Sequence, residues 1–178
     1  GHAAEYSVTD AKYLVRVPKE IVDIAVLTEP LSVVEKGIDM AMRIGQARFD
    51  WKPRSALVLG AGPVGLLATM VLRLMGLSTV TIATRPPESL KAKLVREIGG
   101  TYIDSAVEQV SGEFDIVVEA TGATQVINEG LKHIAPNGVY VLLGVYPGGG
   151  SLSNLGELMT NVVLNNKVIV GSVNAGIK

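Results

Sequence analysis

The sequence predicts a doubly wound α/β fold, in which helices cover both faces of a mostly parallel sheet. From residue 54 onward, short apolar runs alternate with stretches that place apolar residues at helical spacing. Continuous apolar runs are typical of strands buried on both faces, and helices connect such parallel strands. A glycine-rich turn at residues 60–65 joins the first run to the first helix. Six runs match a complete sheet with the strand order 3-2-1-4-5-6.

Hydrophobic periodicity sets the bounds that we expect for each element. The strands are expected at residues 56–60, 79–83, 101–104, 115–119, 139–143 and 168–171, and the helices at residues 64–75, 89–98, 124–134 and 155–164. The stretch between strands three and four, residues 108–113, is short for a crossover helix. We therefore expect an irregular link there.

The first 53 residues carry no glycine motif and have a different pattern. Residues 4–17 alternate loosely and end before Pro18, which predicts a strand and a turn. Residues 21–44 have apolar side chains at helical spacing, and Pro30 fits the first turn of a helix, where its missing N–H is not needed. We therefore divide the chain into a front segment, residues 1–53, and an α/β domain, residues 54–178.

Composition excludes several classes of protein. The chain is 48% apolar and 19% charged, with a net charge of −1 and no cysteine. No apolar run approaches the roughly 18–20 residues that a membrane-spanning helix needs. No cluster of Lys and Arg indicates a nucleic-acid partner, and disulfides or Cys-ligated zinc are impossible within the chain. We expect a cytoplasmic protein that binds neither membranes nor nucleic acids.

The glycine-rich turn has the spacing G-x-G-x-x-G between a strand and a helix, the context that indicates dinucleotide binding in a Rossmann fold. Gly60 allows the tight turn, Gly62 lets the backbone approach a pyrophosphate, and Gly65 permits close packing of the helix on the strand. The first N–H groups of the helix and its dipole then favour the phosphates. The residues that we assign to this cofactor site are Gly60, Ala61, Gly62, Pro63, Val64 and Gly65.

The end of the second strand indicates which dinucleotide is bound. An NAD-binding domain usually has Asp or Glu here to hold the ribose diol, but this chain has Thr84 and Arg85, with no acid until Glu88. Arg85 can pair with a 2′-phosphate, and a charge-assisted hydrogen bond contributes roughly 1.5–3 kcal/mol, or about 10- to 150-fold in affinity. Thr84 can add a hydroxyl donor. NADP is therefore favoured over NAD, and the alternative is that Arg85 is a solvated loop residue.

The ends of strands four, five and six border the other half of such a cleft, because ligands bind outside the carboxyl ends of parallel strands. Strand four ends in a Glu-Ala-Thr-Gly sequence, residues 119–122. The glycines at these ends could equally serve ordinary turns. The residues at the ends of strands five and six that we assign to the nicotinamide half are Leu143, Gly144, Val145, Ser172, Val173 and Asn174.

A cofactor site does not name a reaction. The Tyr-x-x-x-Lys pair of short-chain dehydrogenases is missing, since no tyrosine is followed by lysine four residues later. The chain instead resembles the medium-chain zinc-dependent dehydrogenases, and within them the archaeal-type glucose dehydrogenases. The resemblance spans essentially the whole chain. Its features are Tyr-Leu-Val-Arg-Val-Pro at residues 13–18, Thr-Glu-Pro-Leu-Ser-Val-Val-Glu-Lys at 28–36, Asn137-Gly138, Asn-Asn-Lys at 165–167 and Gly-Ser-Val-Asn at 171–174.

The resemblance implies an activity and a metal. It implies that glucose, and also galactose, is oxidised at the anomeric carbon to a lactone, with transfer of a hydride to NADP. It also implies a zinc ion in the intact enzyme. Glu29 then corresponds to a catalytic residue of the zinc and sugar site, and Asn174 to a residue that touches cofactor and sugar. Val33 departs from the family, which often has a polar sugar-binding residue there. From the sequence alone, Glu29 could simply favour a helix N-terminus.

Most of a zinc site is missing from the sequence. Zinc needs three or four ligands, the chain has no cysteine, and its histidines are His2 and His133. We expect His133 to be an ordinary helix residue. The resemblance implies that the other ligands belong to an upstream catalytic domain, of which residues 1–53 would be a remnant. We therefore expect a cofactor-binding fragment without dehydrogenase activity of its own.

The strand at residues 168–171 is expected at the edge of the sheet and is apolar. Exposed edges tend to be paired or covered, which predicts a homo-oligomer through this edge, with a covered monomer as the alternative. Two other functions stay open: another medium-chain polyol or alcohol dehydrogenase, and a non-catalytic regulatory nucleotide-binding module.

Overall fold

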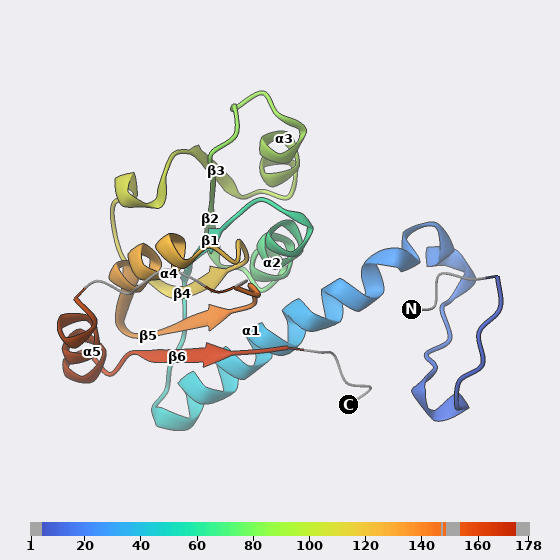
Figure 1. Cartoon of the computed structure of the whole chain (residues 1–178), viewed down its shortest axis with the longest axis horizontal. Coiled ribbons are helices and arrows are strands. Elements are labelled where there is room, and N and C mark those ends of the chain that lie inside the picture. The colour runs from blue at the N-terminus through green and yellow to red at the C-terminus, as the bar shows by residue number, and fades with distance from the viewer. Residues whose placement is uncertain (1–4, 147, 149–153, 174–178) are drawn as a thin grey trace.

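The computed structural model describes residues 5–146, 148 and 154–173. A parallel six-stranded sheet forms its centre, with the strand order β3-β2-β1-β4-β5-β6 (Figure 1). This order confirms the predicted topology. The strands are β1 Ser55–Leu59, β2 Ser78–Ala83, β3 Thr101–Asp104, β4 Phe114–Glu119, β5 Ile134–Leu142 and β6 Val168–Gly171. The helices are α1 Thr28–Arg48, α2 Pro63–Leu74, α3 Leu90–Glu97, α4 Thr124–Gly130 and α5 Leu155–Leu164.

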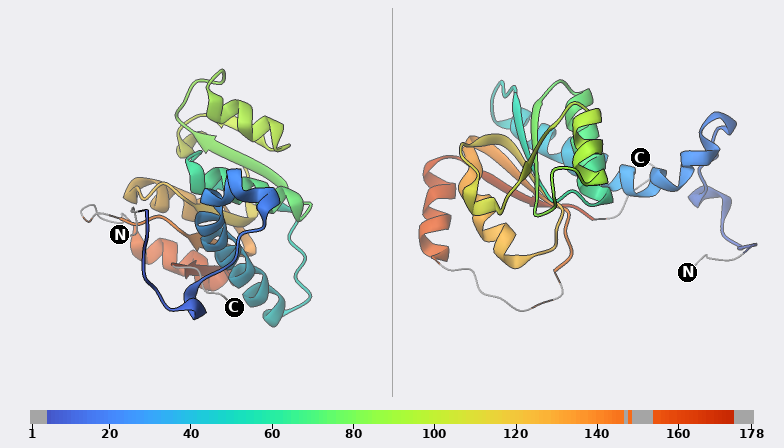
Figure 2. Two further views of the ribbon diagram at one scale, coloured as in Figure 1. Left: turned by 90° about the vertical axis from the view of Figure 1, so that its right-hand side faces the viewer. Right: turned by 90° about the horizontal axis from the view of Figure 1, so that it is seen from above.

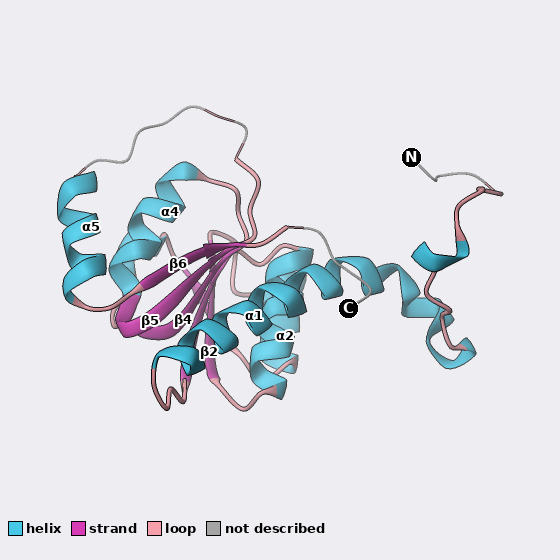
Figure 3. Cartoon of the chain, turned by 90° about the horizontal axis from the view of Figure 1, so that it is seen from below, coloured by secondary structure: helices cyan, strands magenta, loops and turns pink. Residues whose placement is uncertain are grey.

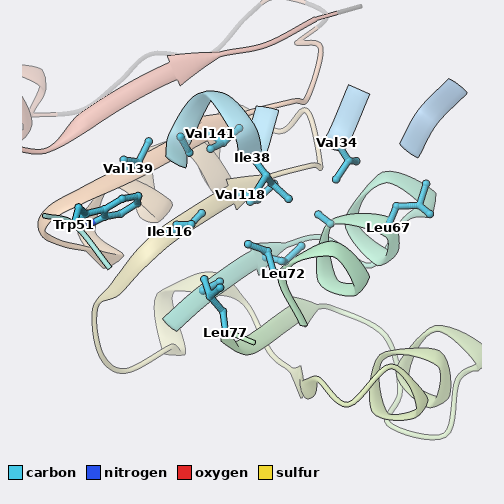
Figure 4. Close-up of a cluster of buried hydrophobic side chains, with 14 residues drawn as sticks. Val34, Ile38, Trp51, Leu67, Leu72, Leu77, Ile116, Val118, Val139 and Val141 are labelled. Carbon is cyan, nitrogen blue, oxygen red and sulfur yellow. The ribbon is translucent and has the colours of Figure 1, made fainter. Parts of the chain in front are cut away.

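Alternation along β1 builds a separate core on each face of the sheet. Ala56 and Val58 point to one face, where they pack with buried residues of α1 and α2. Leu57 and Leu59 point to the other face, where they pack with Tyr140 of β5 and residues near α4. This is the two-residue period of a strand with both faces covered. Figure 4 shows the first core, in which Val34 and Ile38 of α1 lie over the sheet, and Figure 2 shows helices on both sides of it.

The link between β3 and β4 is irregular, as the sequence predicts. It contains one short 3-10 turn, Val107–Gln109, and no α-helix. His133 lies against this link. Its imidazole is buried, with Nδ1 3.0 Å from the Gly112 carbonyl oxygen and Nε2 3.2 Å from the Val107 carbonyl oxygen. His133 therefore has a structural position in the fold.

The helix that we expected at residues 124–134 is shorter than predicted. It ends at Gly130, and a 3-10 turn, Leu131–His133, follows it. His133 is therefore outside the α-helix, contrary to our expectation. Ile134 already belongs to β5, where it pairs with Phe114 before the register shifts at residues 114–116. The fully buried Ile134 side chain joins the core between sheet and helix, so its packing outweighs the helical periodicity.

The predicted strand in residues 4–17 is wrong for the part that the structure describes. Residues 5–17 are irregular apart from a 3-10 turn, Ala11–Tyr13, which Asp10 caps through the Lys12 N–H at 3.1 Å. Lys19–Leu27 is also a 3-10 helix, and the α-helix begins at Thr28, with Pro30 in its first turn. This segment extends away from the sheet (Figure 3), and its apolar side chains are exposed. Among the described residues no strand pairs with it, which explains why no strand forms.

No helix in the described part of the chain is both long and apolar enough to cross a bilayer.

Candidate functional site

A cavity of about 520 Å³ opens at the carboxyl ends of β1, β2, β3 and β4. Its floor is the glycine turn after β1, and its walls are the loops that follow the other three strands. Leu59, Gly60, Gly62, Ile82, Ala83, Thr84, Arg85, Lys91, Ser105, Ala106, Val107, Glu108, Ala120, Thr121, Gln125 and Val126 line it. The position matches the rule that ligands bind at the carboxyl edge of a parallel sheet, where the strand order reverses.

The glycine turn brings the start of α2 against the end of β1. Gly60 has φ +105°, which a residue with a side chain rarely adopts. A Cβ on Gly65 would collide with the Gly60 carbonyl oxygen, so only glycine allows this approach. Gly62 is the N-cap of α2 and Pro63 its first residue, followed by Val64, while the space beside Gly62 is open. The first-turn N–H groups of α2, which have no partner within the helix, therefore lie at a site with room for a ligand.

Two cations, one in the loop after β2 and one at the start of α3, lie at the cavity. Thr84 and Arg85 are exposed and line it, as does Lys91 in the first turn of α3. The Tyr102 hydroxyl lies 3.1 Å from the Ala83 carbonyl oxygen and 2.8 Å from that of Arg85, and so fixes the backbone that carries Arg85. Burial, followed by the nearby Asp104 charge, raises the pKa of Tyr102, which keeps its hydroxyl a donor.

One carboxylate opposes these cations. Glu108 also lines the cavity, and its Oε1 accepts a hydrogen bond of 2.8 Å from Gln125 Nε2. A hydrogen bond from its own backbone N–H, followed by that from Gln125, lowers the pKa of Glu108, so its side chain is charged at neutral pH. The cavity therefore has two positive side chains and one negative side chain that is held by Gln125.

The ends of β4, β5 and β6 are joined by backbone hydrogen bonds. The N–H groups of Leu143 and Gly144 donate to the Glu119 carbonyl oxygen at 2.9 and 3.2 Å, and that of Ser172 donates to Leu142 at 3.1 Å. Lys36 Nζ of α1 donates to the Val173 carbonyl oxygen at 3.0 Å. The structure thus places the predicted residues 143–145 and 172–173 at one edge, beside the cavity but outside its lining. Asn174 lies outside the described residues.

Glu29 lies apart from the cavity. It is exposed in the first turn of α1, where its carbonyl oxygen accepts a hydrogen bond of 2.6 Å from Ser32 Oγ. Gly37 of the same helix lies against Leu143 and Ser172 at the strand ends, so Glu29 is eight residues, or about 12 Å along the helix axis, beyond them. Within the described ranges, no group of three His, Cys, Asp or Glu side chains could hold a metal ion.

Comparison with known proteins decides the family. Residues 22–178 match the family model described as "Glucose dehydrogenase C-terminus". The chain belongs to this glucose dehydrogenase family. The expected family resemblance is therefore confirmed.

Relatives of the glucose dehydrogenase family match over the full chain. The chain is 91% identical to "Glucose 1-dehydrogenase 2" of Vulcanisaeta moutnovskia and 63% identical to "Glucose 1-dehydrogenase" of Thermoproteus tenax, in both cases over 100% of this chain and 51% of the relative. A crystal structure of the Haloferax mediterranei glucose dehydrogenase, in complex with NADP, Zn and gluconolactone, aligns with a TM-score of 0.88 at 34% identity. That alignment covers 95% of this chain and 50% of the other. The chain spans about half the length of the curated relatives it matches.

The sequence did not reveal the roles of three side chains at the site, although it placed Glu119 at the end of strand four. Lys91 could have been noticed, because a cation in the first turn of a helix is electrostatically unfavourable and suggests another role. Glu119 ends an apolar strand and is fully buried, and the Tyr146 hydroxyl donates to it. No sequence spacing links Glu119 to Tyr146, because two different loops bring them together.

Two of the three glycines of the turn, Gly62 and Gly65, give a test of the geometry. Gly65→Ala should lower the free energy of unfolding by about 3 kcal/mol, because the new methyl group meets backbone that cannot move aside. Gly62→Ala should cost at most about 1 kcal/mol, the range of an N-cap change, because its Cβ enters open space. Thermal and urea unfolding measure both. Equal losses in the two variants would contradict the close approach of α2 to β1.

Proposed function

We propose that this chain forms the NADP-binding part of a zinc-dependent glucose 1-dehydrogenase. One observation carries the proposal: the cavity at the strand ends combines an open helix N-terminus with two cations, Arg85 and Lys91. The names of the relatives and the NADP complex of the Haloferax mediterranei enzyme support it. When bound, NADP accepts the hydride that leaves the anomeric carbon of glucose, which becomes the lactone as its hydroxyl loses a proton.

We assign a position to the pyrophosphate, the 2′-phosphate and the nicotinamide of NADP. The pyrophosphate lies over Gly62 at the first turn of α2, where N–H groups and the helix dipole favour negative charge. The 2′-phosphate lies between Arg85 and Lys91, with Thr84 as a further donor. The nicotinamide lies beyond Thr121, at the strand ends that carry residues 143–145 and 172–173.

Zinc does not fit the described residues by themselves. Glu29 supplies one carboxylate, whereas a zinc site needs three or four ligands. We propose Glu29 as one zinc and sugar ligand that acts only together with groups outside the described residues. Asn174, three residues after the last residue of β6 in the sequence, is proposed to contact cofactor and sugar.

We also propose galactose as a second sugar, a cytoplasmic location, and a division of the chain between residues 53 and 54. A homo-oligomer is proposed through β6, which is the last strand of the sheet and exposes 37% of Ile169. Another medium-chain polyol or alcohol dehydrogenase is the alternative activity.

Calorimetric titration with NADP and then NAD tests the cofactor proposal. NADP should bind more tightly, and Arg85→Ala should weaken it by roughly 10- to 150-fold, the contribution of one charge-assisted hydrogen bond. NAD affinity should change little, because NAD lacks the 2′-phosphate. Arg43→Ala is the matched control, since Arg43 is exposed on α1 and pairs with Asp39 at 2.8 Å. Equal binding of NAD and NADP by the unchanged chain would contradict the role of Arg85.

The zinc proposal predicts the behaviour of these 178 residues alone. Glucose, NADP and zinc together should give no NADPH, because one carboxylate cannot hold the metal in a catalytic geometry. The absorbance of NADPH measures the reaction, and an intact glucose dehydrogenase of the family is the positive control. Measurable turnover would contradict the proposal, because it would show that these 178 residues hold a complete site.

A further inference from the structure

A buried carboxylate lies between the two halves of the proposed cofactor site. Glu119 at the end of β4 is 0% exposed. In the described part of the chain no Lys, Arg or His forms an ion pair with it. A buried charge is costly unless hydrogen bonds compensate it. Its Oε1 accepts from the Thr121 N–H at 2.6 Å, the Gly122 N–H at 3.2 Å and the Thr121 hydroxyl, and its Oε2 accepts from the Tyr146 hydroxyl.

These donors come from two loops that lie at the strand ends. Residues 120–122 follow β4, and residues 143–146 follow β5. The loops are in backbone contact, because a Cβ on Gly144 would lie 2.6 Å from the Gly122 nitrogen and would also strike the Glu119 carboxylate. Glu119 therefore accepts hydrogen bonds from both loops. Its donors are backbone N–H groups in the loop of residues 120–122 and the Tyr146 hydroxyl in the loop of residues 143–146.

Tyr146 remains a donor under ordinary conditions. Burial, followed by the hydrogen bond to Glu119, raises the pKa of Tyr146 well above its usual value. Its phenol is therefore neutral at physiological pH and donates a hydrogen bond to the Glu119 carboxylate. In contrast, Val145 next to it is 82% exposed and has no comparable anchor. The second loop is thus held by this side-chain hydrogen bond at its far end, by the Leu143 side chain packed on the core, and by backbone contacts at residues 143–145.

We propose that Glu119 and Tyr146 are positioning residues that hold the loop of residues 143–146 in place for the nicotinamide half of NADP. The inference rests on the proposed function. The first loop contributes Ala120 and Thr121 to the cavity, whereas the second loop borders the nicotinamide end. A loop that is ordered before binding costs the ligand less affinity than one that binding must order. Loss of the Tyr146 hydroxyl should therefore weaken binding only of ligands that carry the nicotinamide.

The test compares two ligands on the full 178-residue chain by calorimetry. NADP carries the nicotinamide, and adenosine 2′,5′-bisphosphate has the 2′-phosphate and adenosine but no nicotinamide. Tyr146→Phe should weaken NADP binding by about 10-fold, a fraction of what a hydrogen bond to a charged group contributes. It should leave the affinity for the bisphosphate within about 2-fold of that of the unchanged chain.

Three further variants separate positioning from a general effect on the fold. Tyr102→Phe should weaken both ligands, because Tyr102 fixes the backbone of Arg85 at the phosphate end. Tyr13→Phe should change neither, because Tyr13 is 66% exposed on the front segment. Glu119→Gln should weaken both ligands, since it disturbs Thr121 as well as Tyr146. Thermal unfolding of each variant shows whether the fold is kept.

Each outcome bears on the inference or on the function. If Tyr146→Phe binds NADP as tightly as the unchanged chain does, or loses both ligands equally, the inference is overturned while the cofactor proposal stands. The same holds if Glu119→Gln changes neither ligand. If the unchanged folded chain binds neither ligand, the proposed function fails, and the inference fails with it.

Discussion

The close approach of α2 to the end of β1 is the constraint on which the rest of the site depends. Only because Gly65 has no side chain can the helix start beside the Gly60 carbonyl oxygen. That contact directs the first turn of α2 toward the switch point of the sheet, where β2 lies on one side of β1 and β4 on the other. The loops after these strands then surround a cavity with a positive helix end at its floor. The buried core on each face of β1 keeps this geometry rigid.

Most of the fold could be predicted from local patterns. The strand order, the irregular link after β3 and helix α5 follow from periodicity and from the glycine turn, because each depends on neighbours in the chain. Two predictions failed where a distant partner decides the conformation. Ile134 joins β5 because Phe114 pairs with it, and residues 5–17 form no strand because no described strand lies beside them. Local periodicity contains neither piece of information.

The residues of the candidate site could likewise be predicted only in part. The glycine turn and Arg85 could be recognised, since their spacing from a strand end has a fixed meaning in this topology. Glu119 and Tyr146 could not, because 27 residues separate them and the contact depends on how two loops fold over one carboxylate. The assignment of Glu29 comes from the family resemblance and from no local pattern. Glu29 lies beyond the strand ends, and no other described residues form a metal site with it.

The central claim is that NADP binds across the carboxyl edge of the sheet at the start of α2. Backbone amide chemical shifts of the folded chain, recorded by NMR while NADP is added, test it most directly. We expect the largest changes at Gly62, Val64, Gly65 and Arg85, with smaller ones at residues 121–122 and 144–145. Changes concentrated instead in the hollow between α4 and α5, near Asn128 and Glu157, would contradict it, as would a folded chain whose spectrum does not respond.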